Sequence, residues 1–503
     1  MANLSYFPLA FYLCAAAILF FFHTAWQNRH QPWGVPMAMV LGTVSIWYLG
    51  DAIYNDYEEY IIRIGEGALH AAWWQVLWFV VAFGLLVPAV HSLVNAAFHH
   101  MPSRVVTYVE HRAHEQPHNQ DRLDRLTISM LVVWILLMSL ALVRTEFDFV
   151  GIFAPYLGAK AQPWARGRMG EGIDALLSLA GYVQILLAAG FGVVAAISHR
   201  PRTLVIALSV CALTLPFFIF DRTRNTMLAT AMPGFLAFVF LRLRGGMITK
   251  GAVLLAGFMV VQFWFSFVIA NRTTSSIARA FHTGQGFERI QEDTKHQGIS
   301  MFSELAFMND FFSRDVISPS WGGRYFAELV NPIPRSVWAG KPMVGIDYAN
   351  ARGFGKGNTA GADAGVSASI ASGLIGQGVL NFGRLFGPLA AALLMSLWVA
   401  VLARQDLLGE DPGRLLLYAV GMVLTFNMGR DITLLVLYPF LFGWLLLQLR
   451  NLLWPEDAKG RPAAPGQEPA AGGYRRMRSR PAAPAIKRPG PDPGEFGDTD
   501  ETR

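Results

Sequence analysis

Long apolar stretches separated by short polar connectors dominate the chain up to about residue 454. A helix of roughly 20 apolar residues is long enough to cross the hydrocarbon core of a bilayer. The pattern predicts an all-α, polytopic membrane protein. On this length criterion it contains about eleven transmembrane helices, which begin near Tyr6, Val35, Ala71, Leu126, Ala175, Thr203, Thr226, Gly251, Leu385, Leu415 and Ile432.

Two polar segments interrupt this pattern. Residues 271–384 form the longest polar stretch between two expected helices, and residues 455–503 are rich in Pro, Ala and Gly with charges of both signs. The second composition cannot bury enough apolar surface to fold, so it predicts a disordered tail. The expected organisation is therefore helices 1–8 in residues 1–270, the polar segment, helices 9–11 in residues 385–454, and the tail.

Lys and Arg in the connectors predict the orientation, because cytoplasmic loops carry an excess of them. Connectors that fall on one side of the membrane contain Arg104, Arg112, Arg122, Arg125, Arg200, Arg202, Arg242, Arg244, Lys250, Arg404 and Arg414. If that side is cytoplasmic, the N-terminus and residues 271–384 are periplasmic and the C-terminus is cytoplasmic. The first apolar stretch lacks a basic n-region and a cleavage site, so we interpret it as a retained helix.

Composition agrees with a membrane protein. Hydrophobic residues make up 53% of the chain and charged residues only 15%, with a mean hydropathy of +0.36, whereas soluble domains carry about 25% charged residues. The formal net charge of +6 is small for 503 residues, and we expect no nucleic-acid partner. The only cysteines, Cys14 and Cys211, lie in apolar stretches, which excludes a disulfide framework.

Cations gather at the expected outer ends of the helices. They are Arg166 and Arg168 in WARGRMGEG, Arg222 and Arg224 in FDRTRN, Arg272 in NRTT, and Arg335 and Lys341 in NPIPRSVWAGKPM. A single cation at a membrane surface usually extends toward lipid phosphates and sets helix depth. Arginine, however, presents a planar fork that matches phosphate oxygens, so several arginines from different helices would suit a diphosphate.

The stretch around Arg335 and Lys341 is unusually stiff. Its prolines, among them Pro332, restrict φ and prevent a helix from continuing. Trp338 is a residue that anchors chains in the interfacial layer of a membrane. We therefore expect this stretch to hold its two cations in place as part of an active-site wall.

Transfer of a group to a hydroxyl benefits from a carboxylate that accepts the proton. The polar segment contains Glu304, Asp310, Asp315, Glu328, Asp347 and Asp363, although most carboxylates on an external segment are solvated surface groups. We favour Glu304 and Asp310, because residues 301–312 (MFSELAFMNDFF) predict an amphipathic helix at the membrane interface.

Metal and nucleotide chemistry find little support in the sequence. The spacing of His111, His114 and His118 resembles that of a ligand set, but Pro117 interrupts the helix they would need. We expect a solvated polar loop there and no metal site. Residues 1–454 contain no DxD-type pair, HExxH motif or Gly-rich nucleotide loop, so a nucleotide-sugar donor is not expected.

Two motifs resemble those of a known family. NPIPRSVWAGKP resembles a signature of bacterial oligosaccharide repeat unit polymerases, the Wzy-like O-antigen polymerase group. Residues 371–388 (ASGLIGQGVLNFGRLFGP) are similar to the group's second signature, in which an acidic residue precedes NFG; Gln377 stands near that position here. The FDRTRN junction and the alternation of helices with one large external segment, over roughly residues 140–450, are also similar.

The resemblance implies a GT-C-like, metal-independent, inverting glycosyltransferase of the bacterial inner membrane that needs no cofactor. Such an enzyme transfers a growing glycan from undecaprenyl diphosphate to a hydroxyl of the next lipid-linked unit, in O-antigen or exopolysaccharide synthesis. Its implied partners are the lipid-linked oligosaccharide donor and acceptor, membrane lipids, and a chain-length regulator or export protein.

The resemblance also implies roles for individual residues. Arg335 and Lys341 belong to the first signature and are expected in the catalytic site, together with the carboxylates Glu304 and Asp310. The expected ligands of the diphosphate are Arg166, Arg168, Arg222, Arg224 and Arg272, and Asn381 is expected to orient a sugar.

Three other functions stay open. An O-antigen-ligase-like enzyme would use the same donor with a different acceptor, and the sequence does not separate the two. A flippase or transporter of lipid-linked glycans predicts charged residues buried along several transmembrane helices, whereas here the charges concentrate at the outer ends. A scaffold of an export complex is the last alternative.

Overall fold

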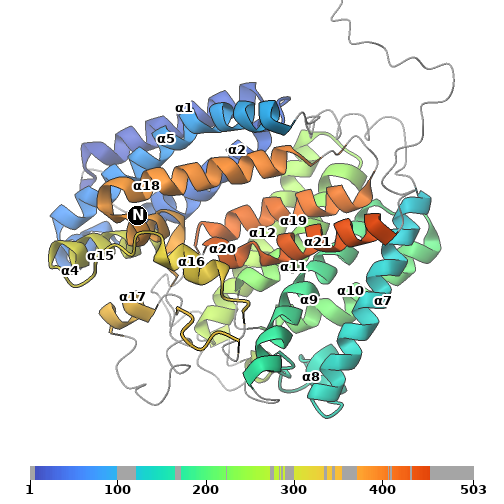
Figure 1. Ribbon diagram of the computed structural model, residues 1–503. Helices are drawn as coiled ribbons and strands as arrows, with labels where there is room; N and C mark the ends of the chain where they lie inside the picture. Colours follow the sequence, from blue (N-terminus) through green and yellow to red (C-terminus); the bar gives the residue numbers. More distant parts are fainter. Residues whose placement is uncertain are drawn as a thin grey trace, which may run out of the picture. The chain divides into compact units, whose positions relative to one another are not determined.

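The computed structural model describes residues 6–98, 120–164, 171–221, 224–271, 277–282, 284, 287–288, 300–333, 337–342, 346–353, 371–405, 407, 411–430 and 433–453. Every regular element in these ranges is helical (Figure 1). This confirms the all-α class that the apolar stretches predict. The expected tail, residues 455–503, lies outside the described residues.

Nine helices in the described ranges are long and apolar enough to cross a membrane, which makes a multi-pass membrane protein. They are α1 (Leu9–Gln27), α2 (Gly34–Val44, continued by a π-helical turn and α3, Gly50–Tyr54), α5 (Glu66–Phe98), α7 (Gln120–Arg144), α9 (Glu171–Ile197), α10 (Pro201–Ile219), α11 (Arg224–Ala237, continued by a π-helical turn), α12 (Met247–Ala270) and α18 (Gly373–Ala403).

The two remaining expected spans are also helical but shorter. They are α19 (Pro412–Met428), with 17 residues, and α21 (Tyr438–Leu453), with 16. A straight span needs about 20 residues. The count of eleven transmembrane helices therefore stays a prediction.

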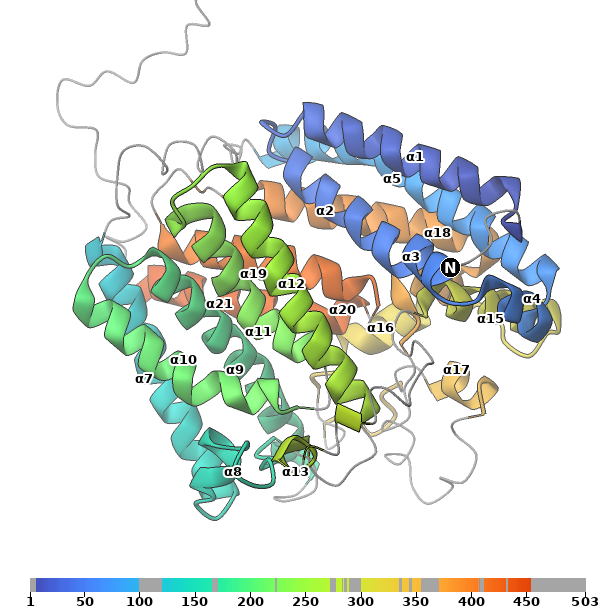
Figure 2. The ribbon, with the colours of Figure 1, turned by 180° about the vertical axis from the view of Figure 1, so that it is seen from behind.

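Seven short helices are spread along one end of the bundle, with α4 and α8 far apart in both views (Figures 1 and 2). They are α4 (Tyr57–Ile64), α8 (Phe149–Phe153), α13 (Ile277–His282), α15 (Met301–Ser313), α16 (Gly323–Leu329), α17 (Ile346–Ala351) and α20 (Thr433–Val436). We call this end, formed by the seven short helices, the segment end, because four of them belong to the polar segment 271–384.

The opposite end of the bundle is fastened by cations of the short connectors. Arg200 binds Asp121 at 2.6 Å and also pairs with Asp124, which joins the starts of α10 and α7. Arg242 donates to the carbonyls of Ala195 and Ser198 at the end of α9. Several of the basic residues that predict a cytoplasmic side thus share one end of the bundle. The side of the membrane on which that end lies stays a prediction.

Helix α18 differs from the expected ninth span, which was predicted to begin at Leu385. It begins at Gly373 and is bent at Gly383, whose φ of 77° and ψ of −178° are accessible essentially only to glycine. A Cβ added to Gly378 would collide with the carbonyl of Gly387. In a straight helix those two residues would be about 13 Å apart, so the chain folds back on itself and residues 373–382 form a separate half-helix.

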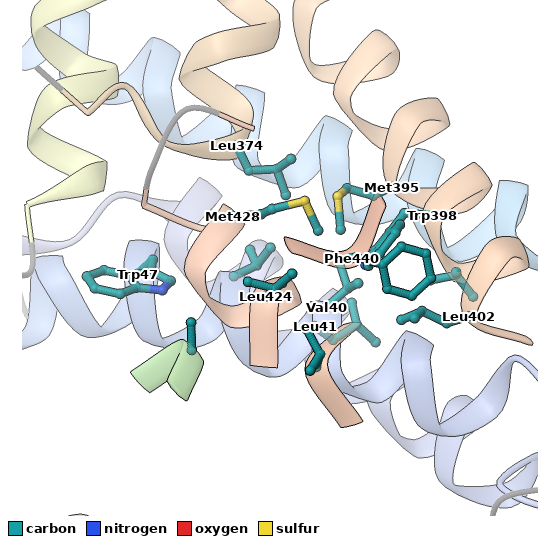
Figure 3. Packing of buried hydrophobic residues seen from close by; sticks show 14 of the residues in the cluster. Val40, Leu41, Trp47, Leu374, Met395, Trp398, Leu402, Leu424, Met428 and Phe440 are labelled. Carbon is teal, nitrogen blue, oxygen red and sulfur yellow. The ribbon is translucent and has the colours of Figure 1, made fainter. Parts of the chain in front are cut away.

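The half-helix is positioned by an apolar core that joins α2, α18, α19 and α21. Figure 3 shows its side chains, which include Val40, Leu41, Trp47, Leu374, Met395, Trp398, Leu402, Leu424, Met428 and Phe440. The indole N–H of Trp47 donates to the carbonyl of Phe426 at 3.0 Å, and that of Trp398 donates to Thr425 at 2.9 Å. Both buried rings thus have their polar atom satisfied.

Helix α15 is a helix as predicted, but it packs inside the bundle instead of lying on its surface. Most of its residues are buried. The carboxylate of Asp51 accepts from the backbone N–H groups of Phe302 at 2.8 Å and Ser303 at 3.0 Å, which caps the N-terminus of α15. The amides of Gln75 and Asn309 bind each other in both directions, at 2.9 and 2.7 Å. These buried polar contacts correct the expectation of an interfacial helix.

Candidate functional site

Two buried glutamates at the segment end organise the candidate site. Glu304 lies on α15 and Glu328 on α16, and each is close to an arginine of the same polar segment. The half-helix 373–382 and α20 complete the surroundings of Glu328. The structure therefore brings together residues from several separated parts of the chain, which connector spacing alone does not predict.

Glu304, one of the two favoured carboxylates, is held by an arginine and a tyrosine. Arg352 donates from Nη2 to Oε1 at 2.9 Å and from Nε to Oε2 at 3.1 Å, a two-pronged ion pair. The hydroxyl of Tyr348 donates to Oε2 as well. The guanidinium carbon of Arg352 lies 3.9 Å from the ring centroid of Phe307. Glu304 thereby fastens α17 and the residue that follows it to α15.

Asp310, the other favoured carboxylate, has a separate partner. Its Oδ1 lies 2.9 Å from Nε of Arg314, one helical turn later, and the side chain of Arg314 is 68% exposed. An exposed ion pair of this kind contributes little to stability. Because Glu304 and Asp310 are not spaced by three or four residues, they lie on different faces of α15. The structure does not bring the two carboxylates into one site.

Glu328 is completely buried, with an exposed fraction of 0%. Its Oε1 accepts from the side-chain amide of Gln377, and its Oε2 accepts from the backbone N–H of Leu434 at 3.0 Å. Its backbone carbonyl accepts from the hydroxyl of Tyr438 at 2.5 Å. Burial raises the pKa of this carboxyl to about 8, although the N–H of Leu434 and the charge of Arg324 oppose the rise. Gln377, the residue that stands in place of an acid in the second signature, is thus bonded to an acid from α16.

Arg324 and Tyr325 precede Glu328 on α16. Arg324 lies four residues before Glu328, so the two share a face of the helix, and Arg324 is only 5% exposed. One guanidinium nitrogen, Nη2, pairs with Asp347 of α17. Burial lowers the pKa of Arg324, and Asp347 opposes that shift. Among the described residues, neither the Nε of Arg324 nor the hydroxyl of Tyr325, both of which are buried, has a hydrogen-bond partner.

Asn381 supports this helix and does not point a free amide at a substrate. Its Oδ1 accepts from the backbone N–H groups of Arg324 and Tyr325, both at 3.2 Å, and from the hydroxyl of Ser320. Its Nδ2 donates to the carbonyl of Gln377 at 2.9 Å. The predicted sugar-orienting residue therefore satisfies the first N–H groups of α16 and positions the arginine.

Lys341 is likewise engaged by its own loop. Its ammonium donates to the carbonyls of Asn331 and Ile333, both at 2.8 Å, and the residue is buried. Trp338 packs edge to face against Phe326 of α16, with ring centroids 6.1 Å apart. The expected stiffness of this stretch thus has a physical basis in the described residues, while its arginine, Arg335, lies outside them.

Most of the other predicted cations also fall outside the described residues: Arg166, Arg168, Arg222 and Arg272. Arg224 is described and begins α11, where its guanidinium carbon lies 5.7 Å from the ring centroid of Phe265 on α12.

Sequence reasoning missed three groups. Lys160 lies 3.0 Å from Asp221 and 4.1 Å from the ring centroid of Phe217, and no motif marks it. Arg352 was missed because its partner, Glu304, is distant in sequence. Glu328 was named among the carboxylates of the polar segment, but its pairing with Arg324 was missed. That pair did leave a signal, namely opposite charges spaced by four residues in GGRYFAEL, a pattern that is common on exposed helices.

Comparison of the chain with protein-family models, with curated proteins and with solved structures finds no match.

Proposed function

We propose that this protein is a membrane-embedded glycosyltransferase that joins lipid-linked oligosaccharide units, using an undecaprenyl-diphosphate-linked donor in O-antigen or exopolysaccharide synthesis. The observation that supports it best is the buried site on α16. There Arg324, whose Nε has no partner among the described residues, lies one turn before the buried acid Glu328, at the end of a bundle of membrane-type helices. The motif resemblance supports the same chemistry.

The proposed reaction places defined demands on the site. A hydroxyl of the acceptor unit attacks the anomeric carbon of the donor sugar, and the bond from that carbon to the diphosphate oxygen breaks with inversion. Negative charge develops on the leaving diphosphate, and fixed cations in a water-poor site stabilise it effectively. Arginine suits this role because its charge persists and its fork matches phosphate oxygens. Arg324 is the described residue that meets these conditions best.

Two related functions are the alternatives. A ligase-like transferase would use the same donor chemistry, and only the acceptor distinguishes it. A flippase would be expected to bury charges along its spans. Within the described residues, buried charges are not confined to the segment end: Arg324 and Glu304 lie there, whereas Asp51 lies in a candidate span and Arg450 pairs with Asp411 between α21 and α19. The motif resemblance, and not the distribution of charge, favours group transfer over transport.

The experiment is an elongation assay. The purified protein in nanodiscs receives a lipid-diphosphate-linked repeat unit, and glycan length is followed by gel electrophoresis and mass spectrometry. We expect longer glycans without added metal or nucleotide. Movement of the unit between leaflets of proteoliposomes with no elongation would instead establish transport.

The same assay with one variant tests whether Arg335 belongs to the active site. We expect Arg335→Ala to abolish elongation while the amount of membrane-inserted protein is unchanged. Undiminished elongation by that variant would remove Arg335 from the active site without affecting the proposed reaction.

A further inference from the structure

We propose that the carboxylate of Glu328 takes the proton of the acceptor hydroxyl. The Nε of Arg324 and the hydroxyl of Tyr325 bind an anionic diphosphate oxygen of the donor beside it. This inference rests on the proposed function and assigns the residue that it leaves open. It replaces Glu304 and Asp310 in that role.

The three carboxylates Glu304, Asp310 and Glu328 differ in the hydrogen bonds that they already accept. Glu304 accepts two bonds from Arg352 and one from Tyr348, and Asp310 is engaged at the edge of α15 with an exposed arginine. Among the described residues, by contrast, Oε1 of Glu328 accepts from the side-chain amide of Gln377 and Oε2 accepts from the backbone N–H of Leu434. A carboxylate has about four acceptor positions, so Glu328 retains capacity for a further donor such as a hydroxyl.

The unpartnered polar atoms of α16 indicate a ligand. Buried polar groups in native proteins are nearly always hydrogen-bonded, because an unmade bond costs about 1–3 kcal/mol. Within the described part of the chain, the Nε of Arg324 and the hydroxyl of Tyr325 are buried polar groups whose hydrogen bonds are not made, and they belong to adjacent residues of one short helix. Both are donors that an anionic oxygen would satisfy. A diphosphate oxygen has the negative charge and the acceptor capacity to bind both donors.

The surroundings of Glu328 suit a group that gains and loses a proton. Among the described residues, the charged and titratable groups that interact with it are Arg324 and Tyr325 on its own helix and Tyr438 of α21. Asp347 engages one side of the Arg324 guanidinium. Burial raises the pKa of Glu328 to about 8, and a general base works best when its pKa is near the operating pH.

Every bond and proton in the proposed transfer step is accounted for. The acceptor oxygen forms the new bond to the anomeric carbon as the bond to the diphosphate oxygen breaks, and the diphosphate leaves with that electron pair. The hydroxyl proton passes to an acceptor position of the Glu328 carboxylate that neither Gln377 nor Leu434 occupies. The protonated carboxyl then releases its proton to water before the next transfer.

The test compares Glu328→Gln with the unaltered protein in the elongation assay, between about pH 6 and about pH 9. The variant keeps the shape and an acceptor oxygen for Leu434. The matched control is Glu59→Gln, which alters an exposed carboxylate of α4. We expect the unaltered protein and the control to speed up with pH to a plateau above about pH 8, and Glu328→Gln to be slower by roughly 100-fold or more with no such rise.

Each outcome decides something different. Elongation by Glu328→Gln at the unaltered rate overturns the inference and leaves the proposed function intact. A pH-independent rate of the unaltered protein across the same range overturns it even if the variant fails to fold. Absence of elongation by the unaltered protein overturns the proposed function, and the inference with it.

Discussion

At the scale of single residues, the segment end is held by side chains that were predicted to contact substrate. Lys341 and Asn381 both have their polar atoms engaged with backbone groups, of the loop and of α16 respectively. Sequence analysis found these residues because their types and motifs are distinctive. It could not tell a residue that binds a ligand from one that positions a neighbour, because that difference lies in which atoms come within hydrogen-bonding distance.

Replacement of Lys341 tests its positioning role. Lys341→Met leaves the carbonyls of Asn331 and Ile333 without these buried donors, and each lost bond costs about 1–3 kcal/mol. We expect faster amide hydrogen exchange in residues 331–342, measured by mass spectrometry, with α5 unchanged. Exchange identical to that of the unaltered protein would show that the ammonium does not hold this loop.

The raised pKa of Glu328 also predicts how the stability of the protein depends on pH. Its folded-state pKa of about 8 lies above the unfolded value of about 4.3. The folded state therefore binds the proton more tightly, and the stability contributed by the neutral carboxyl is lost as pH rises through about 8. The loss is at most about 1.4 kcal/mol per pH unit.

Glu328→Gln removes this titration. We expect its thermal midpoint in detergent, relative to that of the unaltered protein, to rise from about pH 5 to about pH 9. A constant difference between the two midpoints over that range would mean that the carboxyl does not change its proton affinity on folding.

At the scale of elements, apolar length predicted the helices well and their bends poorly. The starts of α10 and α11 agree closely with the sequence, because Pro201 and the polar FDRTRN junction bound them. The half-helix 373–382 was assigned to the polar segment, since nothing in its length shows that the chain reverses at Gly383. Gly378 and Gly387 are needed because their backbones approach each other closely, and this contact is visible only in the folded chain.

The bend of α18 can be tested with a pair of glycine substitutions. Gly378→Ala places a Cβ against the backbone of Gly387, whereas Gly42→Ala on α2 meets no atom within 4 Å. We expect the first to lower the free energy of unfolding by about 1–3 kcal/mol through overpacking, and the second to be neutral or stabilising by up to about 1 kcal/mol. Thermal unfolding in detergent measures both. Equal midpoints would contradict the packed bend.

At the scale of the whole molecule, the distribution of charge over the two ends predicts the orientation. Exposed Glu59 lies on α4 at the segment end, and exposed Arg202 lies at the start of α10 at the opposite end. The natural cysteines, Cys14 and Cys211, are buried. We expect a membrane-impermeant maleimide applied from the periplasmic side to label Glu59→Cys and not Arg202→Cys. The reverse pattern would invert the topology and place the candidate site in the cytoplasm.

The central claim is that the segment end breaks the bond between a donor sugar and its lipid diphosphate as a new glycosidic bond forms. The most direct measurement is the amount of undecaprenyl diphosphate released against the number of glycosidic bonds formed, by the unaltered protein in nanodiscs supplied with one lipid-linked repeat unit. We predict one lipid diphosphate released for each new bond, with inversion at the anomeric carbon. A lipid-linked unit that is recovered unchanged, at every pH at which the protein stays folded, would contradict the account.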